Sequence, residues 1–252
     1  MDMVFASFFV IFLWWISTTV VLALTRKNDI ENNIKTMVLV TIVLALGFLI
    51  LIYSRNVVSV YSAYFGFVSI LMIWAWQETA FLVGWITGNR KSKCPKDSKG
   101  FKRAWLAFQT INYHELTLVI LGVTIWVLTK DSPNDIAFKT FMVLWIMRLS
   151  AKINIFLGVR NFYEEFLPKK ISYLTTYFKR KSYNPLFPFL LAVASIADML
   201  FWYNAGTAVN SFERASLTLI AALLGLGIVE LILMMLPFQL DRIWRLGLLK
   251  RI

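Results

Sequence analysis

Seven long apolar runs separated by short polar segments dominate the pattern of this chain. They cover approximately residues 4–24, 36–53, 57–87, 104–129, 138–158, 186–208 and 215–236. A helix needs about 20 mostly apolar residues to cross the hydrocarbon core of a bilayer. The pattern therefore predicts an all-α membrane protein, a bundle of about seven transmembrane helices forming a single domain. The third run is longer than one span requires, so we expect it to tilt or to extend past the membrane.

Positive charges fall almost entirely on one side of such a bundle. Of the 26 Lys and Arg residues, 20 lie in segments 25–35, 88–103, 159–185 and 237–252, whereas the alternating segments carry only four, which are Arg55, Lys130, Lys139 and Arg214. Basic residues are retained on the cytoplasmic side of membranes. The N-terminus is therefore predicted to lie outside, which is periplasmic in a bacterium, and the C-terminus to be cytoplasmic.

Composition supports the same reading. The chain is 59% hydrophobic and only 16% charged, with a net charge of +12, whereas soluble domains carry roughly 25% charged residues. In a soluble protein this charge would suggest nucleic acid as a partner. In a membrane protein it acts as a topology signal and attracts anionic lipid. We therefore expect membrane lipids as partners, and no nucleic acid.

Two basic segments are candidates for helices lying in the headgroup plane. Within the cytoplasmic segment 159–185, Ile171, Leu174 and Phe178 recur at helical spacing before a basic cluster, and in 238–252 apolar residues mix with basic ones. This composition is typical of interfacial helices. A solvated loop carrying topology charges is the alternative for both segments.

Ionisable side chains inside the predicted spans are the main candidates for a functional site. Each costs about 2.5–3.5 kcal/mol at the centre of a membrane helix, so such groups face inward and pair. Six are charged and three are polar neighbours: Glu78, Glu115, Arg148, Lys152, Asp198 and Glu230, with Gln77, Asn112 and His114.

Most of these charges lie at a similar depth, counted back from the cytoplasmic end of each span. Arg148 and Lys152 are four residues apart and so share one helical face. We expect that face to meet Glu78 and Glu115, while Glu230 joins the cluster or reaches the headgroups. The cluster is either an ion-pair lattice that fixes helix packing, a polar path through the membrane, or a site for the polar edge of a cofactor.

His114 is the one histidine of the chain. A neutral imidazole in a bilayer can be the axial ligand of a chlorin magnesium or a haem iron, so His114 is a candidate pigment ligand. It can equally hydrogen-bond a carboxylate or a backbone carbonyl. A single His and a single Cys exclude metal sites with several imidazoles, and no metal centre is predicted. No catalytic motif is present, and we expect no enzyme activity.

The third run also carries a stripe of small residues at spacings of three and four. The stripe comprises Ser62, Gly66, Ser69, Ala80, Gly84 and Gly88. Small residues on one face allow a second helix to approach closely. The contacting helix belongs either to the same bundle or to a partner subunit.

Several longer strings occur together and in order. They are WAWQE at 74–78, YHE at 113–115, LWIMRLSAK at 144–152, NIFLGV at 154–159, Asn161, EEFLP at 164–168 and NPLFP at 184–188. The set resembles the photosynthetic complex assembly proteins of purple bacteria, the PuhE family, over about residues 14–240. Genes of that family lie near the gene for the reaction-centre H subunit.

That resemblance implies a multi-pass protein of the bacterial inner membrane that supports formation of reaction-centre and light-harvesting complexes or their bacteriochlorophyll supply. It carries over no catalytic residues. The leading hypothesis is an assembly factor or accessory subunit that docks on subunits of these complexes through helix–helix contacts. The alternatives are a carrier of bacteriochlorophyll or a precursor that uses His114, and a transporter built on the buried charges.

Overall fold

The computed structural model describes residues 3–26, 29–162 and 167–237, and within them the chain is helical apart from loops and an isolated parallel bridge between Val159 and Arg180. Within these three ranges, seven helices are long and apolar enough to cross a membrane, as predicted. They are α1 (Met3–Arg26), α2 (Ile30–Ser54), α3 (Val60–Leu82), α5 (Asn112–Thr129), α6 (Ile136–Leu157), α7 (Leu186–Thr207) and α8 (Ser211–Met235). The protein is therefore a multi-pass membrane protein.

Helix starts follow local capping chemistry. Ser59 begins α3 with a capping box, in which its side chain accepts from Ser62 N while the Ser62 hydroxyl accepts from Ser59 N. Asp29 accepts from Asn32 N at the start of α2. These side chains satisfy backbone donors that the first helical turn leaves open.

The third span ends earlier than predicted. α3 stops at Leu82 rather than 87, and Gly84 follows with a φ of 77°. A positive φ is accessible to glycine but strained for other residues. Gly84 and Gly88 therefore lie in a loop, and they do not form a helical small-residue motif.

The predicted fourth span is divided into a short helix, α4 (Gly100–Gln109), and α5. The loop after α3 takes up the backbone groups at the break, since Arg90 N donates to Gln109 O (3.1 Å) and His114 N donates to Thr87 O (2.9 Å). Gly88 packs directly on this break, where a Cβ atom would overlap the carbonyl oxygen of Gln109. Backbone hydrogen bonds from the loop after α3 therefore end α4. The break between α4 and α5 does not depend on a helix-breaking Pro or Gly at that point.

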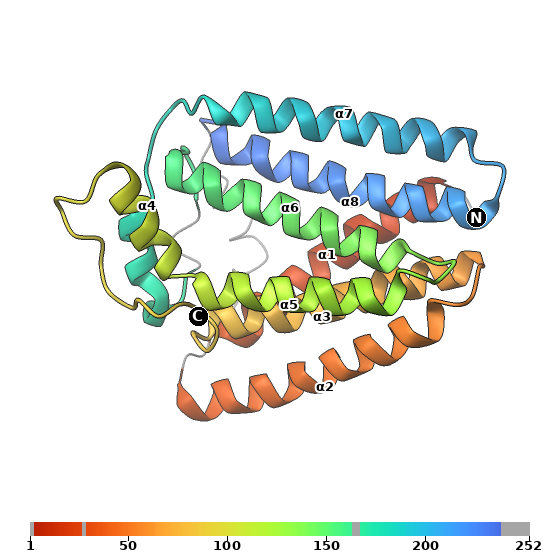
Figure 1. Ribbon diagram of the computed structural model, residues 1–252, viewed down its shortest axis with the longest axis horizontal. Coiled ribbons are helices and arrows are strands. Elements are labelled where there is room, and N and C mark those ends of the chain that lie inside the picture. The colour runs from red at the N-terminus through yellow and green to blue at the C-terminus, as the bar shows by residue number, and fades with distance from the viewer. Residues whose placement is uncertain (1–2, 27–28, 163–166, 238–252) are drawn as a thin grey trace, which may run out of the picture.

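α3 occupies the middle of the bundle and packs against α1, α2, α5, α6 and α8, whereas α7 packs mainly on α8. Figure 1 shows α6, α7 and α8 along one edge and α2 along the opposite edge. α5 and α6 converge at one end of the bundle and diverge toward the end that carries α4. We call the end with α4 and the loop 83–99 the basic end, and the other the far end.

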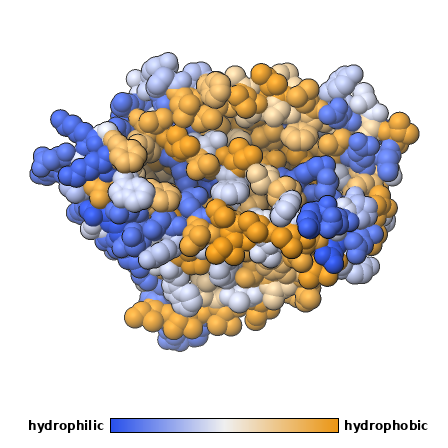
Figure 2. Space-filling view, in the orientation of Figure 1, coloured by the Kyte–Doolittle hydropathy of each residue, from blue (hydrophilic) through white to orange (hydrophobic). Residues whose placement is uncertain are grey.

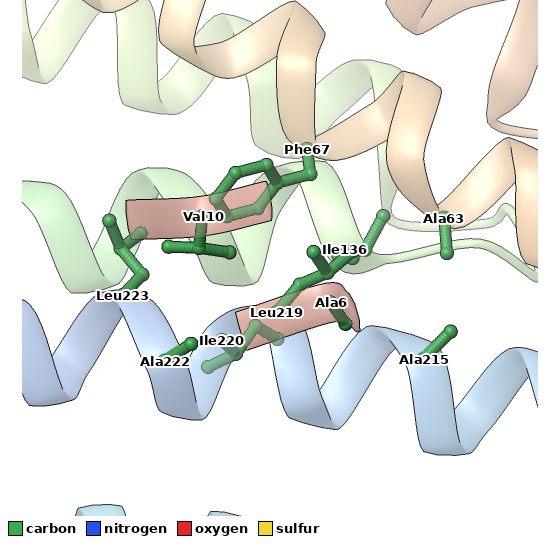
Figure 3. Packing of buried hydrophobic residues seen from close by; sticks show 10 residues of the cluster. All are labelled: Ala6, Val10, Ala63, Phe67, Ile136, Ala215, Leu219, Ile220, Ala222 and Leu223. Carbon is green, nitrogen blue, oxygen red and sulfur yellow. The ribbon is translucent and has the colours of Figure 1, made fainter. Parts of the chain in front are cut away.

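The far half of the bundle has a packed core. Figure 3 shows Phe67 of α3 and Leu219 of α8 together with Val10 of α1, and small residues such as Ala63 and Ala215 let these helices approach. A second cluster joins α3, α5 and α6. On the face shown in Figure 2, apolar side chains form a broad band across the bundle, and hydrophilic residues gather at the basic end and, in smaller number, at the far end.

The basic end is closed by α4 and a 3₁₀ helix, η2 (Lys169–Tyr177), which contact each other. Arg103 Nη2 donates to Tyr177 O (2.6 Å) and Arg90 Nε donates to Tyr177 Oη (2.8 Å). The segment predicted as an interfacial helix, 171–181, is thus partly η2. Its apolar residues Ile171 and Leu174 pack against Phe81 of α3 inside the protein, and their side chains are not exposed to lipid. The second such segment, 238–252, lies outside the described residues.

Candidate functional site

Two ion pairs connect α6 to its neighbours. Arg148 Nη2 lies 2.6 Å from Glu78 Oε2 on α3, and Lys152 Nζ lies 2.6 Å from Glu115 Oε1 on α5. The pairing predicted from depth and from the shared face of α6 is therefore present. Neutralisation of this kind is what allows charges to persist at membrane depth.

Both pairs lie on the wall of a cavity of about 720 Å³, which we call the ionic cavity. α1, α3, α6 and α8 form its sides, and α4, α5 and the chain between α6 and η2 complete it. Most of the wall is apolar and much of it aromatic, with Trp14, Trp74, Phe81, Phe156 and Phe178 among the lining side chains. A mostly apolar cavity with a few converging polar groups is the usual form of a small-molecule site.

Glu230 of α8 is a fifth ionisable group on this wall. Its side chain is exposed and forms no hydrogen bond or ion pair with the residues that the structure describes. The sequence left open whether Glu230 joins the charged cluster or reaches the headgroups. The structure places Glu230 on the same cavity wall as the two ion pairs. Three carboxylates therefore face two cations around the ionic cavity.

The lining of the ionic cavity is mostly apolar toward both ends. Toward the far end it borders the packed core that includes Phe67 and Phe141. Toward the basic end its described lining includes Phe162, Leu174 and Phe178 together with the polar residues Thr110 and Tyr177. The transporter hypothesis requires an aqueous path to the charges, and it stays an alternative hypothesis.

The exposed lining residues mark where the cavity reaches the surface. Phe108 of α4, Leu149 and Ile153 of α6, and Glu230 have exposed side chains. The three apolar ones belong to α4 and α6, and Leu149 and Ile153 lie on a helix that can span a membrane. This part of the opening is therefore bordered by acyl chains, whereas Glu230 adds a polar side chain to it.

His114 does not line the ionic cavity. It is fully buried between α3 and α5, where Gln77 Nε2 donates to His114 O (2.9 Å) and lies 3.1 Å from His114 Nδ1. Since the Gln77 amide donates to Nδ1, the ring proton is assigned to Nε2. The Phe81 ring packs on the imidazole at 4.6 Å between centroids. The imidazole therefore forms a hydrogen bond between α3 and α5 at Nδ1, while its Nε2 is buried without a hydrogen-bond partner among the described residues.

Two other candidates of the predicted polar cluster lie elsewhere. Asn112 begins α5, where its Oδ1 accepts from Asn89 N at 3.0 Å. Asp198 of α7 faces Gly225 of α8, and its Oδ1 is buried without a hydrogen-bond partner among the described residues. Neither residue lines the ionic cavity. The structure thus brings the two ion pairs together and places these two side chains elsewhere.

The small-residue stripe of α3 is covered by the protein itself. Ser62, Ser69 and Ala80 are buried, and a Cβ on Gly66 would lie 2.6 Å from Ile136 Cγ2 of α6. The α3 backbone at Ser69 in turn approaches Gly47 of α2. These contacts correspond to packing within the bundle, the first of the two interpretations left open by the sequence.

Sequence reasoning missed the aromatic residues that close the cavity at the basic end, of which Phe156 receives both Arg103 and Lys179 as cation–π neighbours. It also missed the contact between Asn154 and Asn184. Asn184 Nδ2 donates to Asn154 Oδ1 (2.8 Å), which ties the start of α7 to α6. Periodicity carries no signal for either arrangement, because the partners come from separate segments.

Metal binding has little support in this site. The described residues contain no group of three or more His, Cys, Asp or Glu side chains placed to hold a metal ion.

Known proteins resemble the chain along nearly its whole length. A relative from Rhodobacter capsulatus, described as an uncharacterized 30.4 kDa protein in the puhA 5′ region, is 30% identical over 237 residues, which cover 93% of this chain and 86% of the relative. No solved structure matches. The family described as "Protein of unknown function (DUF3623)" matches residues 1–251. The chain therefore belongs to the DUF3623 family.

Proposed function

We propose that this protein is an assembly factor or accessory subunit of photosynthetic reaction-centre and light-harvesting complexes in a bacterial inner membrane. The observation that carries the proposal is the description of its Rhodobacter capsulatus relative, which is located by reference to puhA. The resemblance to the PuhE family connects that neighbourhood with the reaction-centre H subunit. The protein acts by docking on subunits of these complexes and catalyses no reaction.

α7 provides the docking face. It packs mainly on α8, and its outer side carries an exposed row formed by Phe189, Val193, Ile196, Leu200 and Tyr203. The intervals of four, three, four and three residues place this row on one face of the helix, with the spacing of a helix–helix seam. A single-span helix of a pigment-protein subunit fits such a row, while the basic cytoplasmic end meets peripheral subunits.

The test is affinity purification of the tagged full-length protein from photosynthetic membranes, followed by identification of co-purifying subunits. Ile196→Trp alters the centre of the α7 row. Ile42→Trp on α2 is the matched control, because both isoleucines have 55% exposed side chains. Recovery of reaction-centre or light-harvesting subunits should fall with Ile196→Trp and persist with Ile42→Trp. Absence of such subunits from the wild-type preparation would refute the proposal.

Pigment carriage through His114 gains no support from the geometry, because the imidazole is turned into the α3–α5 interface and does not line the ionic cavity. We therefore retain docking as the proposed function. The ionic cavity raises a separate question, which the docking face does not answer.

A further inference from the structure

The ionic cavity combines three properties that rarely occur together in a helix bundle: a large volume, walls that are mostly apolar, and charged side chains with unused hydrogen-bonding capacity. We propose that it binds an uncharged, lipid-soluble molecule whose polar end carries hydrogen-bond-accepting oxygen atoms. This inference concerns a site separate from the α7 face, and it stands whether or not the docking function is correct.

Volume and lining define the body of the ligand. A cavity of about 720 Å³ lies within the range that holds small organic ligands, roughly 300–1,000 Å³. Trp14, Trp74, Phe81 and Phe156 supply broad apolar surfaces on several sides. A water-filled cavity needs polar partners for its water molecules, and here they are few: the charged patch and the hydroxyl-bearing residues Ser17, Thr18, Thr110 and Tyr177. The rest of the cavity suits hydrocarbon or a flat ring.

Access defines the solubility of the ligand. The packed core lies at one end, mostly apolar residues lie at the other, and the exposed apolar lining residues Phe108, Leu149 and Ile153 border the mouth toward acyl chains. A molecule that enters here comes from the hydrocarbon region. Ions are strongly disfavoured in that region, so the route selects uncharged molecules.

The charges on the wall point the same way. Arg148 and Lys152 are already paired with Glu78 and Glu115, so the wall offers an anionic ligand no unpaired cation. A permanent cation would meet Arg148 and Lys152 at the same patch and would lose its hydration in an apolar cavity. An uncharged polar end avoids both penalties.

Arg148 is the anchor for that polar end. Only its Nη2 is bonded to Glu78, its Nη1 forms no hydrogen bond within the described part of the chain, and 35% of its side chain is exposed. A guanidinium offers five N–H donors. Carbonyl oxygens of a ligand can therefore accept hydrogen bonds from Arg148 without breaking the ion pair to Glu78.

The experiment measures equilibrium binding of three radiolabelled probes to the purified full-length protein in lipid nanodiscs, with empty nanodiscs as background. The probes are a benzoquinone with a decyl tail, dodecanoate and dodecyltrimethylammonium, which differ mainly in the charge of the head. We expect saturable binding of the benzoquinone, at least about tenfold tighter than binding of either ion. Lack of saturable benzoquinone binding, or tighter binding of an ion, overturns the proposal.

Two variants locate the site. Ala75→Phe places a ring in the cavity from α3 and should weaken benzoquinone binding about tenfold or more, whereas Ala45→Phe, at an exposed position of α2, should leave it unchanged. Equal binding by wild type and Ala75→Phe overturns the proposal. Because Ala75→Phe fills space without removing a charge, it tests the site even if variants of the ion pair fail to fold.

A third variant tests the anchor. The double substitution E78Q/R148Q removes both charges together and leaves no ion unpaired. It should weaken benzoquinone binding roughly tenfold, as expected for loss of a hydrogen bond from a charged donor. Unchanged affinity in the folded double variant would show that Arg148 does not hold the ligand.

The natural ligand can be identified from what co-purifies with the protein. Chlorins and quinones are both candidates, because both carry uncharged carbonyl groups on an apolar body. Absorbance spectra of a solvent extract distinguish the two. Retention of the pigment or quinone by Ala75→Phe in wild-type amount would contradict binding in the cavity.

Discussion

The Arg148–Glu78 pair allows a quantitative test of how the bundle tolerates charge. Removing one partner of a buried pair leaves an uncompensated charge, which costs about 3–5 kcal/mol. The Arg148 side chain is 35% exposed and that of Glu78 is 13% exposed, so the lower end of this range applies. We expect Arg148→Gln and Glu78→Gln each to lower the free energy of unfolding by about 3 kcal/mol.

The double variant should be much less destabilised, by about 1–2 kcal/mol, because it leaves no charge unpaired. The coupling free energy is then about 4–5 kcal/mol, larger than the roughly 0.6 kcal/mol average of hydrogen bonds between membrane helices. Equilibrium unfolding in mixed detergent micelles, followed by circular dichroism, measures all four proteins of the cycle.

A matched control lies on the same helix. Lys139 and Asp135 at the start of α6 are 2.8 Å apart, but their side chains are 47% and 51% exposed. Exposed pairs of this kind contribute about 1 kcal/mol or less, so the equivalent cycle should show little coupling. Equal coupling at the two pairs, or additive effects at Arg148 and Glu78, would refute the reasoning.

Two further predictions concern the break after α4 and the orientation of the bundle. Gly88→Ala should destabilise the protein by at least about 2 kcal/mol, because its Cβ would overlap the backbone at Gln109. Gly206→Ala has open space around its Cβ and should be neutral or slightly stabilising. Thermal unfolding in detergent compares the two variants, and equal effects would contradict the packing argument. Cys94, the one cysteine of the chain, lies in the loop at the basic end. A membrane-impermeant maleimide should label it in inverted vesicles but not in intact spheroplasts, and the reverse result would invert the predicted orientation.

Sequence reasoning predicted those features that depend on one helix at a time. The seven spans follow from the length of apolar runs. The pairing of Arg148 and Lys152 with Glu78 and Glu115 follows from helical periodicity and from depth, because a charge in hydrocarbon has few alternatives to an oppositely charged neighbour at the same level. These two rules are local, and the structure agrees with both.

The features that sequence reasoning missed depend on contacts between distant segments. The break at Thr110 arises because residues 87–90 form backbone hydrogen bonds with Gln109 and His114, and the apolar run 104–129 contains no sequence signal for it. His114 was open to two interpretations because a histidine pattern does not reveal its neighbours, and the structure places Gln77 beside it. The ionic cavity depends on how the helices diverge, which single-helix periodicity does not encode.

The ionic cavity also bears on whether the charges are purely structural. An ion-pair lattice that only fixes helix packing needs partners and close contacts, and protein interiors are normally packed to crystal-like density. Here the pairs border about 720 Å³ of space, and unfilled volume lowers stability. Glu230 adds a third carboxylate that no described cation pairs with. Selection for packing alone would fill this volume and remove the third acidic side chain. The arrangement is therefore better explained by a ligand that fills the cavity and contacts its polar side chains.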